Sequence, residues 1–426
     1  MEQITKELLQ FIQQSTSPYH TVLAAKHLLE HNGFQSLDLT AGWSLQPEGK
    51  YYVSVFDSCL LAFRIGKPAA KGLRLAAAHT DFPCFRIKPA PEVTGHGYGT
   101  LNVEGYGGMI VSTWLDRPLS LAGKVVTRTT DPFAPETHFV DFKRPLLTIS
   151  NLAIHMNREV NDGYKWNKQK DVLPLATLVD KKQPDKQFFQ KFLARELGCK
   201  VEDILSFELS TYPVEQGCTV GLDEEFISSG RLDNLTSVVG CLKGIINGAC
   251  TSRLQVAALF DNEEVGSNTK QGADSLVLDH VLRRIYSKLG LDAEQLDQDL
   301  AGGFMLSVDV AHALHPNYVD KCDITNQPVL NGGVVLKQAS TQSYAGDAEA
   351  VAIVKGLCDA NGIPCQLFVN RSDVKGGSTL GSMASALTPI RTMDIGVALL
   401  AMHSARETMG VKDQEALERL ITVFFG

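Results

Sequence analysis

Five places along the chain put metal-binding residue types at or beside the end of a predicted element. In chain order they are His79 with Asp81, Asp233, the adjacent pair Glu263 and Glu264, Asp309, and His403. Imidazole nitrogen and carboxylate oxygen are ligands that suit zinc, and two metal ions can share one bridging carboxylate. The set supplies one shared carboxylate and, for each metal, one histidine and one further carboxylate. One of the two adjacent glutamates remains, and it is a candidate general base.

Most of these places also have a plainer interpretation when each is taken alone. His79 with its neighbours could form a surface turn, and the acidic run at Glu263 could be a solvated loop. Asp233 or Asn234 could simply cap the amphipathic helix that follows. A lone histidine is more often structural than a ligand. The exception is Asp309, because a carboxylate inside an apolar strand is rare unless it is paired or bound to metal.

Short apolar runs predict the strands that must position these residues. The runs are Leu73–Ala78, Leu254–Phe260, Phe304–Val308 and Ile390–Val397. Apolar runs of this length fit parallel strands that are covered on both faces. Helical patterns alternate with several of them, which predicts a three-layer α/β/α sandwich around a mixed, mostly parallel sheet. In such sheets functional groups gather at the carboxyl ends of the strands, where these candidate ligands lie.

The composition changes between Pro91 and Gly221. This stretch is rich in glycine and proline turns and carries short β-type runs, at Leu121–Thr127 and Pro145–Ser150. We therefore predict a discontinuous catalytic domain, residues 1–91 and 222–426, with an inserted β-rich domain over residues 92–221.

Composition excludes several other classes of protein. The net charge of the 426 residues is −8, and the sequence has no block of positive charge of the kind that binds nucleic acid. No apolar run reaches the roughly 18–20 residues that span a bilayer, and the first residues do not resemble a signal peptide. The nine cysteines form no CxxC pair, so we expect reduced, mostly buried thiols and a cytoplasmic protein. Any metal must then sit on His, Asp and Glu.

Several stretches together resemble the aspartyl aminopeptidase family over nearly the whole chain. The stretches are Ser15-Thr16-Ser17-Pro18-Tyr19-His20, Ala78-His79-Thr80-Asp81-Phe82-Pro83-Cys84, Asn151-Leu152-Ala153-Ile154-His155, Arg231-Leu232-Asp233-Asn234, Asp261-Asn262-Glu263-Glu264-Val265-Gly266-Ser267 and Ala401-Met402-His403-Ser404-Ala405-Arg406-Glu407. The central ligand pattern occurs in several two-zinc hydrolase families. The Ser-Pro-Tyr-His and Met-His-Ser-x-Arg-Glu segments make the match specific.

The resemblance implies a role for each candidate ligand. Asp233 would bridge two zinc ions, for which manganese or cobalt could substitute. His79 and Asp309 would complete one metal site, and Glu264 and His403 the other. The resemblance also assigns Glu263 as general base and Asp81 as the residue that orients His79. The implied activity is hydrolysis of the N-terminal residue, with a preference for Asp or Glu, from small peptides.

The resemblance also implies an assembly and a substrate site. The inserted domain would be a dimerisation domain, and the dimers would build a tetrahedral dodecamer. His155 would reach the active site of a neighbouring subunit. The candidate substrate-binding residues are His155, Lys337, Tyr344, Gly377 and Ser378. Gly377 and Ser378 could offer backbone N–H groups to the substrate, or their loop could be an ordinary Gly-Gly turn.

Some positions depart from the eukaryotic pattern of this family. Gln342-Ser343-Tyr344 stands where the eukaryotic form has Gln-Arg-Tyr, and the substrate loop reads Lys375-Gly376-Gly377-Ser378-Thr379. Two alternatives therefore stay open. One is a related two-zinc aminopeptidase or acyl-amino-acid hydrolase of broader specificity, and the other is a catalytically silent assembly protein.

Overall fold

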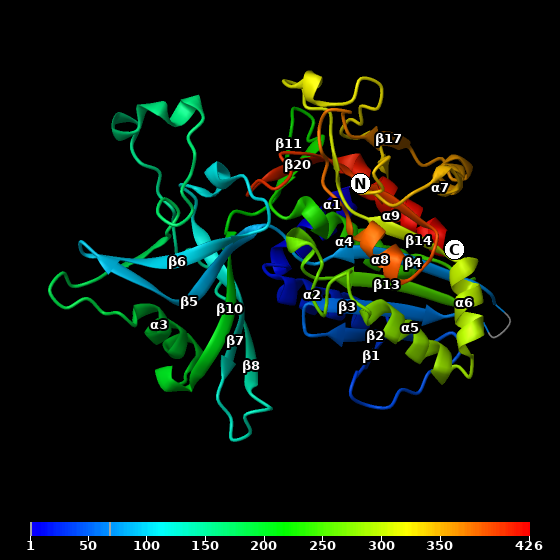
Figure 1. Cartoon of the computed structure of the whole chain (residues 1–426), viewed down its shortest axis with the longest axis horizontal. Coiled ribbons are helices and arrows are strands. Elements are labelled where there is room, and N and C mark those ends of the chain that lie inside the picture. The colour runs from blue at the N-terminus through cyan, green and yellow to red at the C-terminus, as the bar shows by residue number, and fades with distance from the viewer. Residues whose placement is uncertain (1, 68–69) are drawn as a thin grey trace. The chain divides into compact units, whose positions relative to one another are not determined.

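The computed structural model describes residues 2–67 and 70–426, which form two compact units. The large unit comprises Met1–Asp81, Gly217–Met402 and Glu407–Gly426, and the small unit comprises Phe82–Gln216 and His403–Arg406 (Figure 1). The small unit thus begins ten residues before the predicted limit of the inserted domain (82 against 92). Its long segment ends five residues before the other predicted limit (216 against 221).

A nine-stranded mixed sheet forms the centre of the large unit (Figure 1). In spatial order its strands are β1 (Gln35–Leu37), β2 (Lys50–Val55), β3 (Cys59–Ile65), β13 (Leu254–Phe260), β4 (Leu73–His79), β14 (Phe304–Val308), β18 (Thr392–Gly396), β16 (Val334–Gln338) and β17 (Cys365–Val369). The four predicted strands are neighbours, β13-β4-β14-β18, and all three of their pairings are parallel. The predicted last strand begins at Thr392 rather than at Ile390.

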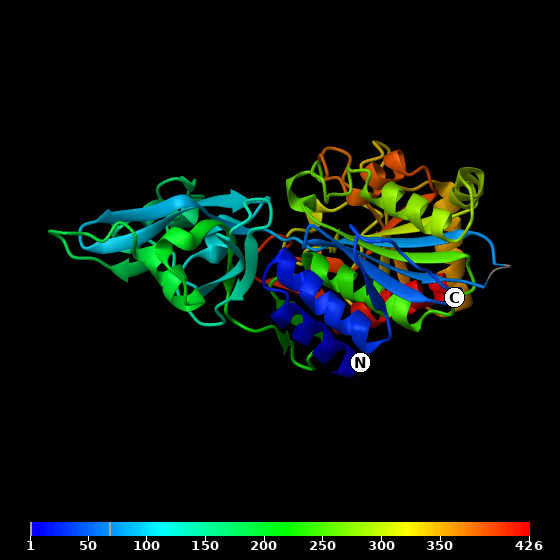
Figure 2. The same cartoon turned by 90° about the horizontal axis from the view of Figure 1, so that it is seen from below.

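Helices cover both faces of this sheet, as Figure 2 shows. The helices of the large unit are α1 (Glu2–Gln14), α2 (Pro18–His31), α4 (Leu232–Asn247), α5 (Val277–Lys288), α6 (Ala293–Ala301), α7 (Ala348–Ala360), α8 (Leu380–Leu387) and α9 (Val411–Phe425). Leu75 and Ala77 of β4 share a core with Leu380 of α8, whereas α4 packs on β4 together with α9. Side chains alternate across a strand, so α8 and α4 lie on opposite faces. The predicted α/β/α sandwich is confirmed.

The register of the parallel strands brings their carboxyl ends to one edge of the sheet. Phe260 at the end of β13 is paired with His79 at the end of β4. On the other side of β4, Ser307 of β14 is paired with Ala77. The residues that follow these strands, including Asp309, therefore emerge side by side at the same edge.

A second, five-stranded sheet in the large unit has the order β11-β12-β20-β19-β15. Its strands are β11 (Cys218–Val220), β12 (Phe226–Ser229), β20 (Glu407–Gly410), β19 (Ala398–Leu400) and β15 (Ala311–His312). The antiparallel pairing of β12 with β20 sets Ser229 opposite Glu407. It therefore brings Glu407 beside the start of α4, which carries Asp233.

The small unit is built on a six-stranded antiparallel sheet and one helix, α3 (Phe188–Leu197). The strands are, in spatial order, β8 (Glu136–Asp141), β7 (Leu119–Thr127), β10 (Ile204–Pro213), β5 (Cys84–Gly95), β6 (Tyr98–Tyr106) and β9 (Leu175–Leu178). The run Leu121–Thr127 is a strand as predicted, within β7. The run Pro145–Ser150 is not: it makes only isolated bridges at Leu147 and Thr148. Its β-type composition was misleading because it pairs too briefly for a strand.

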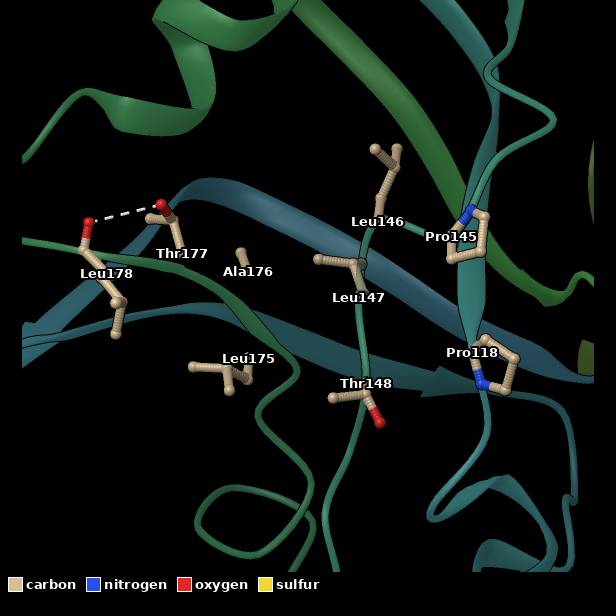
Figure 3. A pocket seen from close by; sticks show the side chains of 9 residues that line it. All are labelled: Pro118, Pro145, Leu146, Leu147, Thr148, Leu175, Ala176, Thr177 and Leu178. Carbon is tan, nitrogen blue, oxygen red and sulfur yellow. Dashed lines mark hydrogen bonds between the residues drawn. The ribbon is translucent and has the colours of Figure 1, made fainter.

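An apolar groove of about 440 Å³ opens on the small unit (Figure 3). Two stretches of backbone line it, Pro145–Thr148 and the edge strand β9, together with Pro118. Leu178, at the end of β9, is largely exposed. The groove is therefore a surface where apolar side chains meet solvent.

All nine cysteines lie in the described residues and all are free thiols. Four of them are buried, four are partly exposed and Cys218 is exposed, so the expectation that most are buried is wrong. Among the described residues, no helix combines the length and the apolar content that a membrane crossing requires.

Candidate metal centre

His79 is the centre of a buried cluster of carboxylates in the large unit. Its Nε2 atom lies 3.5 Å from Asp233 Oδ1, 3.6 Å from Asp309 Oδ1 and 3.9 Å from Glu263 Oε2. On the other side of the ring, Nδ1 lies 3.1 Å from the carbonyl oxygen of Asp81. A carbonyl only accepts hydrogen bonds, so Nδ1 carries a proton, and Nε2 is the ring nitrogen that faces the carboxylates. Once Nε2 gives up its own proton, the imidazole is in the tautomer that a metal ligand needs.

Asp81 joins the two segments that follow β4 and β13. Its Oδ1 atom is 3.3 Å from His79 Nδ1 and accepts a hydrogen bond from the backbone N–H of Glu263 at 3.1 Å. Its Oδ2 atom accepts from the backbone N–H of Glu264, also at 3.1 Å. Asp81 is fully buried. It therefore orients the imidazole and also fixes η5 (Glu263–Val265), the turn that carries both glutamates.

Asp233 is held by a residue that the sequence analysis did not assign a role. The backbone N–H of Asp233 donates to Glu407 Oε2 at 3.0 Å, and both residues are buried. Asn234 donates from Nδ2 to the carbonyl oxygen of Val308, 3.0 Å away. The backbone dihedrals of Asp233 and Asn234 are not helical, so regular helical geometry in α4 begins after Asn234, and the alternative that one of these residues caps the helix stays a prediction. The sequence contained a signal for Glu407, because this residue is the last of the Met-His-Ser-Ala-Arg-Glu stretch.

Asp309 follows β14 and faces the only lysine of this cluster among the described residues. Its Oδ2 atom accepts from Lys337 Nζ at 3.2 Å, and Nζ also donates to the carbonyl oxygen of Val310 at 3.0 Å. Burial by itself would raise the pKa of Asp309, but the charge of Lys337 and the hydrogen bond with His79 hold it well below its usual range. Asp309 is therefore a carboxylate with one oxygen directed to His79 and the other to Lys337.

Glu263 shows the opposite shift. Burial, followed by the charges of Asp309, Asp81 and Asp233, raises the pKa of Glu263 to about 8, although His79 opposes the shift. The cluster thus holds more negative charge than its one lysine and one imidazole balance. Carboxylates that crowd together in this way are stable when a cation lies among them. The donor set therefore fits a divalent metal ion.

Two groups of three residues within the large unit have ligand atoms close enough to hold metal. One atom each of His79, Asp233 and Asp309 lie within 4.8 Å of one another, and so do one atom each of His79, Glu263 and Glu264. Asp233 also has an oxygen within the same distance of an oxygen of Glu264. The nitrogen and oxygen donors are of the kind that zinc and manganese accept, and Asp233 lies near donors of both groups. This is the arrangement that a bridging carboxylate requires.

The predicted ligand His403 lies in the four-residue segment that groups with the small unit. There its Nδ1 atom lies 3.0 Å from the carbonyl oxygen of Gly108. Because a carbonyl only accepts, Nδ1 carries a proton, and Nε2 is the nitrogen that would bind a metal.

The predicted substrate-binding residues occupy different environments. Tyr344 is buried, and its ring centroid lies 5.1 Å from Lys337 Nζ. Gly377 and Ser378 are exposed in the loop before α8. His155 is exposed in η2 (Ile154–Met156) of the small unit. Their roles toward a substrate stay predictions.

Comparison with known proteins places this cluster in a family context. The sequence profile of the aminopeptidase I zinc metalloproteases (M18) matches residues 11–425. The chain is 45% identical to the probable M18 family aminopeptidase 2 of Clostridium acetobutylicum, over 99% of this chain and 98% of that protein. Among solved structures it is similar to Ape4 in its complex with Nbr1, with a TM-score of 0.94 and 33% identity over 100% of this chain and 85% of that chain. It is also similar to the S. cerevisiae mApe1 dodecamer, with a TM-score of 0.84 and 27% identity over 99% and 96%.

Protons and metal must compete for this cluster. Burial would lower the pKa of His79, but Asp309, Asp81 and Glu263 raise it well above the usual range. A ligand imidazole must be neutral, and metal disfavours a protonated Glu263, so binding releases protons. Zinc affinity should therefore rise by about tenfold or more per pH unit between pH 6 and 8, as follows from the release of at least one proton. Calorimetry in two buffers of different ionisation enthalpy measures the zinc affinity and the number of protons released on binding. Glu263→Gln is expected to release fewer protons than the parent protein. An affinity that is constant over this range would contradict the interpretation.

Proposed function

The chain belongs to the aminopeptidase I zinc metalloprotease family and is a metal-dependent aminopeptidase, and from this premise we propose that it releases acidic N-terminal residues from small peptides with two zinc ions per subunit. The observation that carries the proposal is the cluster in which His79 lies beside Asp233, Asp309 and Glu263. Asp233 of this cluster also lies near Glu264. Family membership confirms the resemblance found in the sequence.

We propose that His79 and Asp309 hold one ion, that Glu264 and His403 hold the other, and that Asp233 bridges them. His403 is supported by its place in the chain. It stands four residues before Glu407, which bonds the backbone of Asp233, and four extended residues span at most about 14 Å. When bound, two zinc ions would polarise the scissile carbonyl and acidify a water.

Glu263 is the proposed general base. It lies at the edge of the cluster and its side chain keeps some exposure, 14%, so water can reach it. Its pKa, about 8 without metal, must fall when cations bind, because positive charge favours the carboxylate form. At neutral pH Glu263 would then take a proton from the attacking water and pass it to the leaving amine.

Lys337 is the proposed source of the acidic preference. It is a buried cation beside the cluster, and its charge is balanced by Asp309 and Asp394. If metal ions take up the charge of Asp309, Lys337 becomes available to attract the carboxylate of a substrate Asp or Glu side chain.

We further propose that the protein works in the cytoplasm as a dodecamer built from dimers of the small unit. The mApe1 structure to which the chain is similar is a dodecamer. The small unit also carries the open apolar groove with the exposed Leu178, the type of surface that oligomers bury. The nine free cysteines suit a reducing compartment.

A panel of aminoacyl chromogenic substrates, with and without chelator and re-added zinc, tests the function. We expect chelator-sensitive release that is fastest from Asp and Glu. Glu263→Gln should bind the same amount of zinc but lose turnover by ~10²–10⁴-fold, the usual contribution of a general base. Release of other residues alone would overturn the acidic preference and retain the mechanism. Near-normal turnover in Glu263→Gln would remove the base assignment.

His155 has its own test. We propose that it reaches the active site of a neighbouring subunit, since it is exposed on the small unit. His155→Phe should then lower turnover in protein that keeps its zinc and its assembly size by light scattering. The exposed His96 of the same unit, changed to Phe, is the matched control and should retain full turnover. Equal activity of the two variants would disprove the role.

A further inference from the structure

Asp394 is a buried carboxylate that neither the proposed metal sites nor the general base uses. It lies on β18 and has no exposure to solvent. Burial raises its pKa to about 6, against the effects of Lys337 and of its hydrogen bonds with Ser307 and Ala345. Burying a carboxylate costs free energy, and an ionisable group of this kind beside an active site is a candidate for a functional role.

The hydrogen bonds of Asp394 hold one short segment of backbone. The N–H of Ala345 donates to Asp394 Oδ2, and the hydroxyl of Ser307 donates to Oδ1. The backbone N–H of Asp394 in turn donates to the carbonyl oxygen of Ala345 at 2.8 Å. Ala345 is thereby bonded to Asp394 through both of its peptide groups, although it lies outside any helix or strand.

This segment carries Tyr344 and adjoins the predicted substrate loop. The carbonyl oxygen of Ser343 accepts from the N–H of Thr379, the residue after Ser378. Tyr344 lies beside Lys337, with 5.1 Å between Nζ and the ring centroid. Asp394 therefore fixes the backbone on which Tyr344 is placed.

We propose that Asp394 is a positioning residue for the substrate side of the site, which fixes the backbone that carries Tyr344 and so sets how strongly the N-terminal residue of the peptide is held. The inference rests on the proposed aminopeptidase function. It assigns Asp394 no part in holding metal.

Asp413 offers a matched control within the same unit. It is fully buried, and it accepts from the backbone N–H of Asn331 at 2.7 Å and of Gly333 at 2.8 Å. Burial raises its pKa to about 6, as for Asp394. Asp413→Asn and Asp394→Asn thus remove the same charge and comparable hydrogen bonds from two buried places.

The experiment compares the two variants in the full-length, zinc-loaded protein. For Asp394→Asn we expect KM for an acidic substrate to rise by about tenfold or more, with kcat within about threefold of the parent value, because the loss of an interaction that helps to bind the substrate raises KM. Zinc content should stay that of the parent protein. Asp413→Asn should lose similar thermal stability and keep its KM. Equal KM changes in the two variants, or a loss confined to kcat, would overturn the proposal.

Amide hydrogen exchange gives a second readout that needs no turnover. The Ala345 amide should be protected in the parent protein and in Asp413→Asn, and should exchange faster in Asp394→Asn. Ser307→Ala, which removes one donor and keeps the carboxylate, replaces Asp394→Asn if that variant does not fold and should raise KM by less. Unchanged protection of Ala345 would disprove the positioning. A parent protein that cleaves no substrate would instead refute the proposed function, while the exchange result would still report on Asp394.

Discussion

The structure of the large unit depends on one electrostatic constraint: carboxylates are packed around a single buried imidazole with too little positive charge to balance them. Glu263 and Asp309 lie in the same cluster and their pKa values move in opposite directions. The difference is that Lys337 bonds Asp309, whereas Glu263 is surrounded by other carboxylates. The one lysine balances the charge of one carboxylate, and the remaining carboxylates need a cation to balance theirs. The site is therefore suited to bind metal. Its other features hold the carboxylates together against their mutual repulsion.

The fold supplies that restraint in two ways. Parallel strands in register deliver His79, Glu263 and Asp309 to one edge of the sheet, where their side chains converge. Hydrogen bonds from backbone N–H groups then fix the acidic side chains. Asp81 accepts from the two glutamates of η5, and Glu407 accepts from Asp233. The second sheet matters because its pairing of β12 with β20 brings Glu407 to the start of α4.

The sequence predicted those features that local pattern determines. The four buried strands could be found because each is apolar almost throughout. Asp309 could be singled out because it was expected to lie inside such a strand, although it in fact follows the last residue of β14. The contacts that arise from distant parts of the chain could not be found. Glu407 acts through strand pairing, and the bond between Lys337 and Asp309 joins a residue of β16 to a residue that follows β14. Asn234 resembled a helix cap, and nothing in the sequence indicated that its side chain also donates a hydrogen bond to Val308. Pro145–Ser150 resembled a strand, but it has neighbours for only two isolated bridges.

The central claim is that Asp233 is shared by two metal ions, and zinc stoichiometry tests it most directly. The measurement is zinc per chain, by elemental mass spectrometry, in protein equilibrated with buffered zinc and then freed of excess. We expect two zinc ions per chain in the parent protein and a loss from both sites in Asp233→Asn, because one carboxylate serves both. A single zinc in the parent protein, or an Asp233→Asn variant that still holds two, would contradict it.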